Sequence, residues 1–209
     1  MSAARFALTS AFALWTAVWA GGGCSLKQAA PIKQAYLVEA KRTDAPRAGA
    51  GQGVLRVRGL QVNAPFEGRG FVYRRGEFQY QTDFYHEFLV PPRALFSEQT
   101  AQWLTASGQF KLVELSGHTE STYGLEGTVS ALYGDFRDKQ APKAVLALEF
   151  VMTDERARST PAFWSHGYSE AVALERSTPE ALAAGWSAAL QKILTTLEKD
   201  LAKDLTGRP

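Results

Sequence analysis

The sequence predicts an α+β domain: a single mixed, mainly antiparallel sheet with two amphipathic helices packed on one face. Two observations predict it. Two segments repeat apolar residues at helical spacing between recognisable ends, whereas most other segments alternate apolar and polar residues with the period of two that marks strands. Their order along the chain is strands, helix, strands, helix, which is typical of helices laid on one side of a sheet.

Short strands are expected before the first helix. In one of them Leu55 and Val57 alternate with Arg56 and Arg58, so we expect one buried face and one charged face. The tripeptide Arg75-Gly76-Glu77 separates two aromatic segments as a tight hairpin turn would. The Gly/Ala/Pro-rich stretch 42–53 has no pattern that would order it by itself. The candidate strands are 36–38, 54–62, 71–74, 78–81 and 83–90.

The first helix is expected over 92–107, because proline is tolerated in a first turn and Gly108 is a good C-terminal stop. Strands follow at 110–115, 123–133, 144–152 and 163–174. From Tyr123 to Tyr133 every second residue is expected on one face. The segment 144–152 is apolar on both faces, which predicts a central strand covered on both sides.

The second helix has the clearest pattern in the chain. Ser177-Thr178-Pro179-Glu180 is a capping box with proline inside the first turn. The apolar stripe that follows predicts an amphipathic helix lying on the sheet, with contact to a membrane surface as the alternative. Its residues are Leu182, Trp186, Leu190, Ile193, Leu197 and Leu201.

The N-terminus has the pattern of an export signal. Arg5 precedes an apolar run over 6–20 and three glycines, and then comes Cys24, the only cysteine of the chain. A basic start, a short apolar run and small residues are typical of a secretory signal peptide. Bacterial lipoproteins carry lipid on a cysteine just after the cut. Gly21 stands where the lipobox prefers an aliphatic residue, so cleavage after Ala20 without acylation is the alternative.

These patterns divide the chain into three parts: a signal peptide over 1–23, a lipidated N-terminus and tether over 24–33, and a single α+β domain over 34–209. The domain contains no cysteine, so intrachain disulfides cannot stabilise it. The formal net charge is +2, and no Lys/Arg run exceeds two residues, which does not favour nucleic acid as a partner.

Residues that could carry chemistry are sparse. His86, His118 and His166 lack partners at metal-ligand spacing, and the chain has no nucleophile-elbow motif. We therefore predict no catalytic residues, no metal site and no cofactor other than covalent lipid on Cys24, and we expect the protein not to be an enzyme.

Aromatic residues crowd the segment 66–88, and two interpretations stay open. They form the core beneath the helices, or some of them lie exposed on a surface that faces a partner or lipid, with Arg56, Arg58, Arg74 and Arg75 near them. The candidate partner-facing residues are Arg56, Arg58, Tyr73, Arg74, Tyr80 and Tyr85.

Several of these features together resemble a known family. The signal ending at Cys24, Tyr36-Leu37, Val54-Leu55-Arg56-Val57 and Phe71-Val72-Tyr73-Arg74 are similar in kind and order to the ABC-type transport auxiliary lipoproteins, which include paraquat-inducible protein C. The similarity continues through Tyr80, Tyr85, Phe88, Pro91-Pro92, Trp103-Leu104 and Phe110 and covers most of the mature chain.

The resemblance implies a non-enzymatic, lipid-anchored protein that faces the periplasm. Members accompany MCE-type transport systems, which move lipids or other hydrophobic molecules between the two membranes. It implies an MCE-domain protein as partner, an outer-membrane location because Ser25 rather than aspartate follows the cysteine, and association with copies of itself. The alternatives are a lipid-carrying module with its own apolar cavity and a cell-envelope assembly factor.

Overall fold

The structure is a computed structural model that describes residues 32–47, 51–115, 117–157 and 162–206. The predicted signal peptide 1–23, the lipidation site Cys24 and all but the last two residues of the predicted tether 24–33 lie outside the described residues. None of the helices in the described part of the chain is long and apolar enough to span a bilayer.

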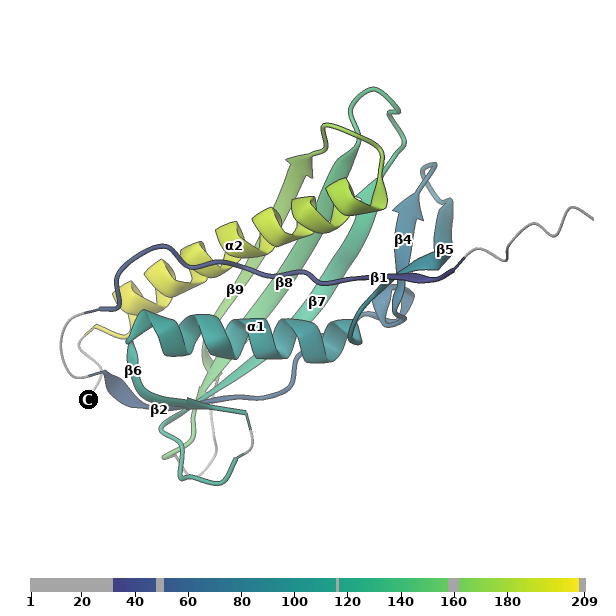
Figure 1. Ribbon diagram of the computed structural model, residues 1–209. Helices are drawn as coiled ribbons and strands as arrows, with labels where there is room; N and C mark the ends of the chain where they lie inside the picture. Colours follow the sequence, from purple (N-terminus) through teal and green to yellow (C-terminus); the bar gives the residue numbers. More distant parts are fainter. Residues whose placement is uncertain (1–31, 48–50, 116, 158–161, 207–209) are drawn as a thin grey trace, which may run out of the picture. The chain divides into compact units, whose positions relative to one another are not determined.

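The described chain forms the predicted α+β fold, with one mixed sheet and two long helices (Figure 1). The strands are β1 (Gln34–Tyr36), β2 (Gln52–Val57), β3 (Gln61–Val62), β4 (Gly70–Arg74), β5 (Tyr80–Phe88), β6 (Phe110–Glu114), β7 (Tyr123–Asp135), β8 (Lys143–Asp154) and β9 (Ala162–Ala173). The helices are α1 (Pro92–Ser107), α2 (Pro179–Asp204) and a short 3-10 turn, η1 (Ala64–Phe66).

Strand β7 organises the sheet. It pairs antiparallel with β8 along its whole length, and β8 pairs antiparallel with β9. The other edge of β7 receives β2, β3 and β4 one after another, all parallel to it. Strand β2 also pairs with β6 at one end of the molecule. At the other end, β4 pairs with β5, and β5 pairs with β1. The sheet therefore has two separate short flanks, one at each end of β7.

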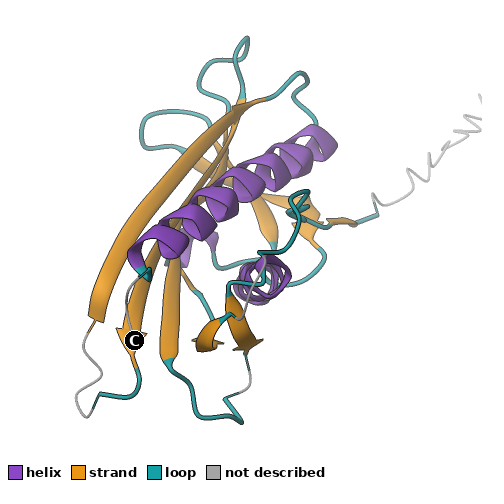
Figure 2. Cartoon of the chain, turned by 90° about the vertical axis from the view of Figure 1, so that its left-hand side faces the viewer, coloured by secondary structure: helices purple, strands orange, loops and turns teal. Residues whose placement is uncertain are grey.

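Helix α2 packs on β8 and β9, and both long helices lie on the same face of the sheet (Figure 2). The predicted stripe from Leu182 to Leu201 is buried. Near its N-terminal end, the indole of Trp186 meets the ring of Phe71 edge-on at 4.8 Å, lies 5.2 Å from the ring of Phe88 and donates to the carbonyl of Val145. The core therefore lies between α2 and the sheet and includes part of the β4–β5 flank.

The predicted first helix is confirmed at both ends. Pro92 stands in its first turn, and Gly108 closes it with a left-handed backbone at φ 68°. Glycine reaches that conformation without the steric cost that a side chain imposes.

An extended segment, residues 37–47, runs between the two helices (Figure 1). The backbone amide of Glu39 donates to Ser187 of α2, and that of Ala40 donates to Gln99 of α1. Arg42 forms an ion pair with Glu198 at 2.9 Å. Although 42–53 has no ordering pattern of its own, its first residues are therefore held by tertiary contacts.

Two strand expectations need correction. The predicted strand 54–62 is broken after Val57, because the chain turns to bury Leu60, whose amide donates to the hydroxyl of Ser97 in α1. In β7 a bulge between Val129 and Ala131 shifts the register, so Leu132 is buried instead of its neighbours. An extra residue on one strand reverses the faces beyond it.

Two further expectations change in detail. The helix-facing residues of β8 are fully buried as predicted, but Val145, Ala147 and Val151 on its other face are only partly buried, so the strand is not covered on both sides. Helix α2 is capped by Thr178, which accepts from the amide of Ala181, rather than by the predicted capping box. Glu180 instead accepts from the hydroxyl of Tyr36 at 2.8 Å.

Candidate functional site

The aromatic segment 66–88 divides equally between the core and the surface, so each of the two open interpretations describes half of it. Four of its aromatic residues are buried: Phe66, Phe71, Tyr73 and Phe88. The other four are exposed, at 89% for Phe78, 46% for Tyr80, 69% for Phe84 and 40% for Tyr85. The β4–β5 flank therefore contributes to the core on one side and exposes large rings on the other.

A bulge in β5 causes Phe84 and Tyr85 to be exposed. Gly70 of β4 faces Glu87, whereas Val72 faces Thr82, so β5 contains extra residues between these two pairs. The extra residues include both rings, which contact each other edge-on at 5.2 Å. A bulge re-aims side chains that a regular strand would place on opposite faces.

Asp83 holds the bulge together. Its carboxylate accepts from the hydroxyl of Tyr73 at 2.7 Å and from the backbone amides of Tyr85 and His86 at 2.7 and 3.1 Å. It also lies 2.7 Å from Nδ1 of His86. At Gly70, across the ladder, a side chain would collide with the carbonyl oxygen of Asp83, because a Cβ there would lie only 2.5 Å from it.

These contacts set the pKa values at the bulge. Burial alone raises the pKa of Asp83, but the hydrogen bonds from Tyr73, His86 and the two amides outweigh it and lower the pKa to about 2. Burial and the bond to Asp83 raise the pKa of Tyr73. Asp83 is therefore a carboxylate and Tyr73 a neutral donor at every physiological pH, as a structural pair requires.

The first described residues of the chain lie against this bulge. Gln34 of β1 pairs with His86, and Nζ of Lys33 lies 4.8 Å from the centre of the Phe84 ring. Lys33 also forms an ion pair with Glu87 at 3.4 Å. Ile32 is 85% exposed. The structure thus brings together the N-terminal end of the domain and the exposed rings of β5.

The β4–β5 hairpin adds two arginine–aromatic contacts. The guanidinium of Arg74 lies 5.6 Å from the ring centre of Tyr80, and that of Arg75 lies 5.1 Å from the ring centre of Tyr73. A cleft of about 460 Å³ lies between β5 and the start of α2. Its lining includes Tyr73, Arg75, Asp83, Tyr85, Phe136 and Thr178. Of the candidate partner-facing residues, Tyr73, Arg74, Tyr80 and Tyr85 therefore share one flank. The ring of Tyr73 is buried in the core, however, which corrects its prediction as a partner-facing residue.

Arg56 and Arg58 lie elsewhere, which corrects the expectation that they are near the aromatic residues. Arg56 sits beside Gly124 at one end of β7, and Arg74 sits beside Asp135 at the other. At about 3.3 Å per residue, these positions are roughly 35 Å apart.

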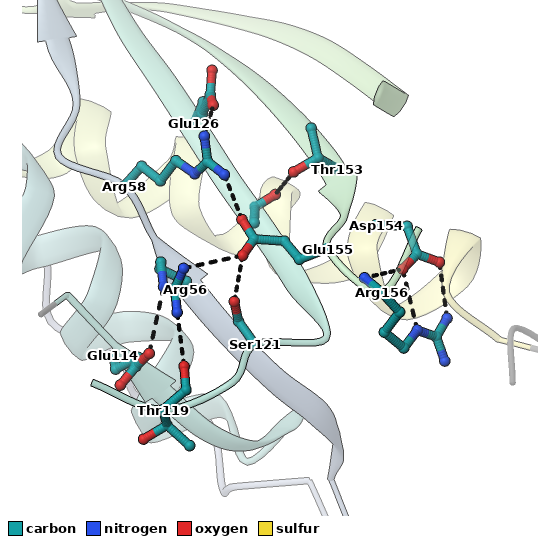
Figure 3. Close-up of polar contacts among 11 residues, drawn as sticks. Arg56, Arg58, Glu114, Thr119, Ser121, Glu126, Thr153, Asp154, Glu155 and Arg156 are labelled. Carbon is teal, nitrogen blue, oxygen red and sulfur yellow. Dashed lines mark hydrogen bonds and ion pairs between the residues drawn. The ribbon is translucent and has the colours of Figure 1, made fainter. Parts of the chain in front are cut away.

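The two distant arginines are held in an ion-pair network around Glu155 (Figure 3). Glu155 is 3.2 Å from Arg56 and 2.7 Å from Arg58, and it also accepts from Ser121. Burial alone raises the pKa of Glu155, but the bonds from Ser121 and Arg58 lower it below its ordinary value. These arginines are thus occupied in joining β2 to β7 and β8.

In the described residues, no group of three or more His, Cys, Asp or Glu side chains could hold a metal ion. His86 is bonded within the β5 bulge, and His118 and His166 are exposed.

Comparison with known proteins finds no matching family model and no matching curated protein. Solved structures do share the fold. A crystal structure from Xanthomonas campestris, described as a DUF330 protein, aligns with a TM-score of 0.72 at 15% identity over 84% of this chain and 99% of that one. An uncharacterized protein aligns with a TM-score of 0.65 at 12% identity over 81% and 99%.

A lipoprotein from Neisseria meningitidis gives a TM-score of 0.41 at 9% identity over 73% of this chain and 99% of that one, and we draw nothing from it. At these identities the first two alignments establish the fold alone, and function does not follow from a fold.

The candidate residues predicted from the sequence do not include Ile32, Lys33, Phe78 or Phe84. The available signal was Asp83 followed by two adjacent rings, since aspartate is disfavoured within strands and often bonds to backbone amides two residues on.

Proposed function

We propose that this chain is a lipid-anchored, non-enzymatic envelope protein that faces the periplasm and serves an MCE-type ABC transport system as an adaptor at the outer membrane. The sequence supports this proposal through the export signal, Cys24 and the family resemblance. The fold is compatible with it, since a DUF330 protein shares the architecture over nearly its whole length.

The observation that carries the proposal is the position of the exposed rings. Phe84 and Tyr85 lie where the domain begins, beside Lys33, and Lys33 is only nine residues from the predicted anchor at Cys24. A scaffold that displays large apolar groups next to its anchoring end suits a protein that works at a membrane and docks other components there.

The physical advantage of such an anchor is concentration. A single acyl chain binds membranes weakly, so stable attachment requires more than one signal, and a processed lipoprotein cysteine carries several chains. Attachment by a short tether confines the domain to a thin layer beside the bilayer. That confinement raises its effective concentration for a partner in the same layer, so modest contacts are enough.

The alternative of a lipid-carrying module is less well supported. Such a module needs an apolar cavity between sheet and helices, and large side chains occupy that region. Trp186, Phe71, Phe88, Phe96 and Phe150 are among the largest fully buried residues. Native mass spectrometry for co-purified lipid tests this alternative directly.

Crosslinking in intact cells tests the adaptor role. A photo-crosslinking residue placed at Tyr80 of the full-length chain, a position 46% exposed beside Arg74, is expected to capture an MCE-domain protein. One placed at Lys199, an exposed residue of α2, serves as the matched control. Recovery of only cell-wall synthases would favour the envelope assembly factor and overturn the proposal.

Lipid attachment needs its own test. Labelled palmitate is expected to enter the unmodified chain and a Ser25→Ala variant but not a Cys24→Ala variant. Equal labelling of the unmodified chain and the Cys24→Ala variant, with both recovered as soluble material, would contradict the anchor.

A further inference from the structure

The exposed large apolar side chains of the described residues are concentrated on one flank. Leu112 and Leu115 belong to the β6 end of the molecule. The others belong to β1, β5 and the chain next to them. They are Ile32, Leu37, Phe78, Tyr80, Phe84, Tyr85 and Leu89. Scattered apolar residues are normal on a protein surface, but a concentration of this kind marks an interaction site.

The chain outside the described residues limits what can cover this flank. Ile32 is bonded through the intervening tether to Cys24, and a tether of that length reaches at most about 28 Å when fully extended. Lys33, the next residue, already touches the Phe84 ring. If Cys24 is embedded in a bilayer, the surface around Phe84 is therefore within reach of that same bilayer.

The charges on this flank suit a lipid interface. Asp83 is turned inward to Tyr73 and His86, and Glu87 is paired with Lys33 and with Arg69 at 3.4 and 3.0 Å. Both acids of β5 are thus compensated, while Lys33 and Arg69 keep 51% and 43% of their side chains exposed. Aromatic rings beside basic side chains with long apolar stems are typical of the headgroup region of membranes.

The geometry of the bulge also suits insertion into a bilayer. It projects Phe84 and Tyr85 together from the strand, and Asp83 fixes its backbone through the bonds described above. A fixed pair of rings enters a bilayer interface at a lower entropic cost than a mobile loop would.

We propose that the β5 bulge is a second membrane contact, which inserts Phe84, with Tyr85 and Ile32 beside it, into the interface of the bilayer that holds acylated Cys24. This inference rests on the proposed lipid anchor. It adds a defined orientation: the β1–β5 flank faces the bilayer, and the β6 end points away from it.

The test uses the full-length chain purified from membranes and reconstituted into vesicles of phosphatidylglycerol and phosphatidylcholine with brominated acyl chains. Cys24 is the only cysteine, and acylation blocks its thiol, so Phe84→Cys provides a unique site for a fluorescent label. Leu112→Cys on β6, exposed at 45%, is the matched control. Tyr85→Cys gives a second probe on the bulge.

We expect brominated lipid to quench the labels at positions 84 and 85 at least threefold more than the label at 112. Equal quenching at all three positions overturns the insertion, and so does crosslinking of position 84 to a second copy without quenching, since the flank would then be a protein interface.

Palmitate labelling of the same samples tests the lipid anchor at Cys24 separately from membrane insertion of the β5 bulge. Acylated protein without quenching at 84 contradicts insertion and leaves the anchor intact. If the chain is not acylated, the anchor fails. Cys24 is then replaced by alanine, so that position 84 carries the only thiol, and its label is measured with the chain added to preformed brominated vesicles. Quenching there still supports insertion, and its absence overturns it.

Discussion

Tyr73 donates its hydroxyl hydrogen bond to Asp83 across the β4–β5 ladder, at 2.7 Å, from a ring that is itself part of the core. One side chain thus links the interior of the domain to the bulge that displays Phe84 and Tyr85. The surface proposed to face the membrane is therefore not an independent loop, and its geometry depends on the packing beneath it.

Substitution of Asp83→Asn tests this dependence. Asparagine keeps the shape but loses the charge that strengthens the bonds from Tyr73 and His86, so we expect the free energy of unfolding to fall by about 1–3 kcal/mol. Urea denaturation at neutral pH measures the change. Asp138→Asn, at an exposed position in the β7–β8 loop, is the control and is expected to change little. Equal losses in both variants would contradict the role of Asp83.

The same residue predicts a pH dependence. The pKa of Asp83 is lowered in the folded state to about 2, from 3.8 for the ordinary group. A lowered pKa means that the carboxylate contributes stability above pH 3.8, and this contribution, about 2 kcal/mol, is lost as the pH falls toward 2. Denaturation curves of the wild-type chain and of Asp83→Asn are expected to converge over that range. A constant difference between them down to pH 2 would contradict the assignment.

Trp186 should be the most sensitive position of α2. It is fully buried between Phe71 and Phe88, so Trp186→Ala leaves a cavity and removes the hydrogen bond to the carbonyl of Val145. We expect a loss of about 3–5 kcal/mol in the free energy of unfolding, measured by thermal or urea denaturation. Lys199→Ala, on the exposed face of the same helix, is expected to stay within about 0.5 kcal/mol. A loss below about 1 kcal/mol at Trp186 would mean that the core repacks around it.

Helix α2 shows why part of the fold could be read from the sequence. Its stripe repeats over many turns, and each repeat adds to the same interpretation, so the buried residues from Leu182 to Leu201 were predicted correctly. The cap was predicted less accurately, because Thr178 rather than the predicted capping box caps the helix, and Glu180 accepts from the distant Tyr36.

The β5 bulge shows what the local pattern cannot contain. Phe84 and Tyr85 are neighbours in the sequence, and a regular strand would place one of them inside. The register change depends on Gly70 and Tyr73 of the partner strand, and alternation within one segment does not report such contacts. The same limit explains why the sequence wrongly predicted Arg56 and Arg58 near the aromatic residues. Arg56 and Arg74 are close in the sequence, but their strands, β2 and β4, pair with opposite ends of β7.

Substitution of Gly185→Ala in α2 is expected to have two opposing effects on stability. Glycine inside a helix costs about 1 kcal/mol relative to alanine, so Gly185→Ala would stabilise an isolated helix. In the fold, a Cβ at this position would lie 2.7 Å from atoms of both Ala144 and Leu174. We expect the clash to dominate and to lower the free energy of unfolding by about 1–3 kcal/mol.

Chemical denaturation measures this effect. The exposed Ala184→Gly, one residue away, provides the matched comparison, since it should show only the helix-propensity cost of about 1 kcal/mol. A stabilised Gly185→Ala variant would show that α2 can shift away from β8 without cost.

The network around Glu155 holds Arg56 and Arg58 in contacts within the fold. The Glu155 side chain is 10% exposed and serves both Arg56 and Arg58, whereas Arg58 is 44% exposed. Glu155→Ala leaves Arg56 with Glu114 and the carbonyl of Thr119 only, and we expect it to cost about 1–3 kcal/mol of stability. Arg58→Ala should cost at most about 1 kcal/mol, because exposed ion pairs contribute little. Urea denaturation at neutral pH measures both losses.

The pKa of Glu155 is lowered in the folded state, so its contribution is present at neutral pH and is lost as the pH falls below the ordinary glutamate range. The cost of Glu155→Ala is therefore expected to shrink on acidification.

Partner capture in intact cells distinguishes the two ends of β7. Arg58→Ala should leave capture from position 80 unchanged, whereas Arg74→Ala, on the β4–β5 flank, should reduce it. Loss of capture with Arg58→Ala and normal capture with Arg74→Ala would place the docking surface at the β2–β6 end instead, because β2 and β4 pair with opposite ends of β7.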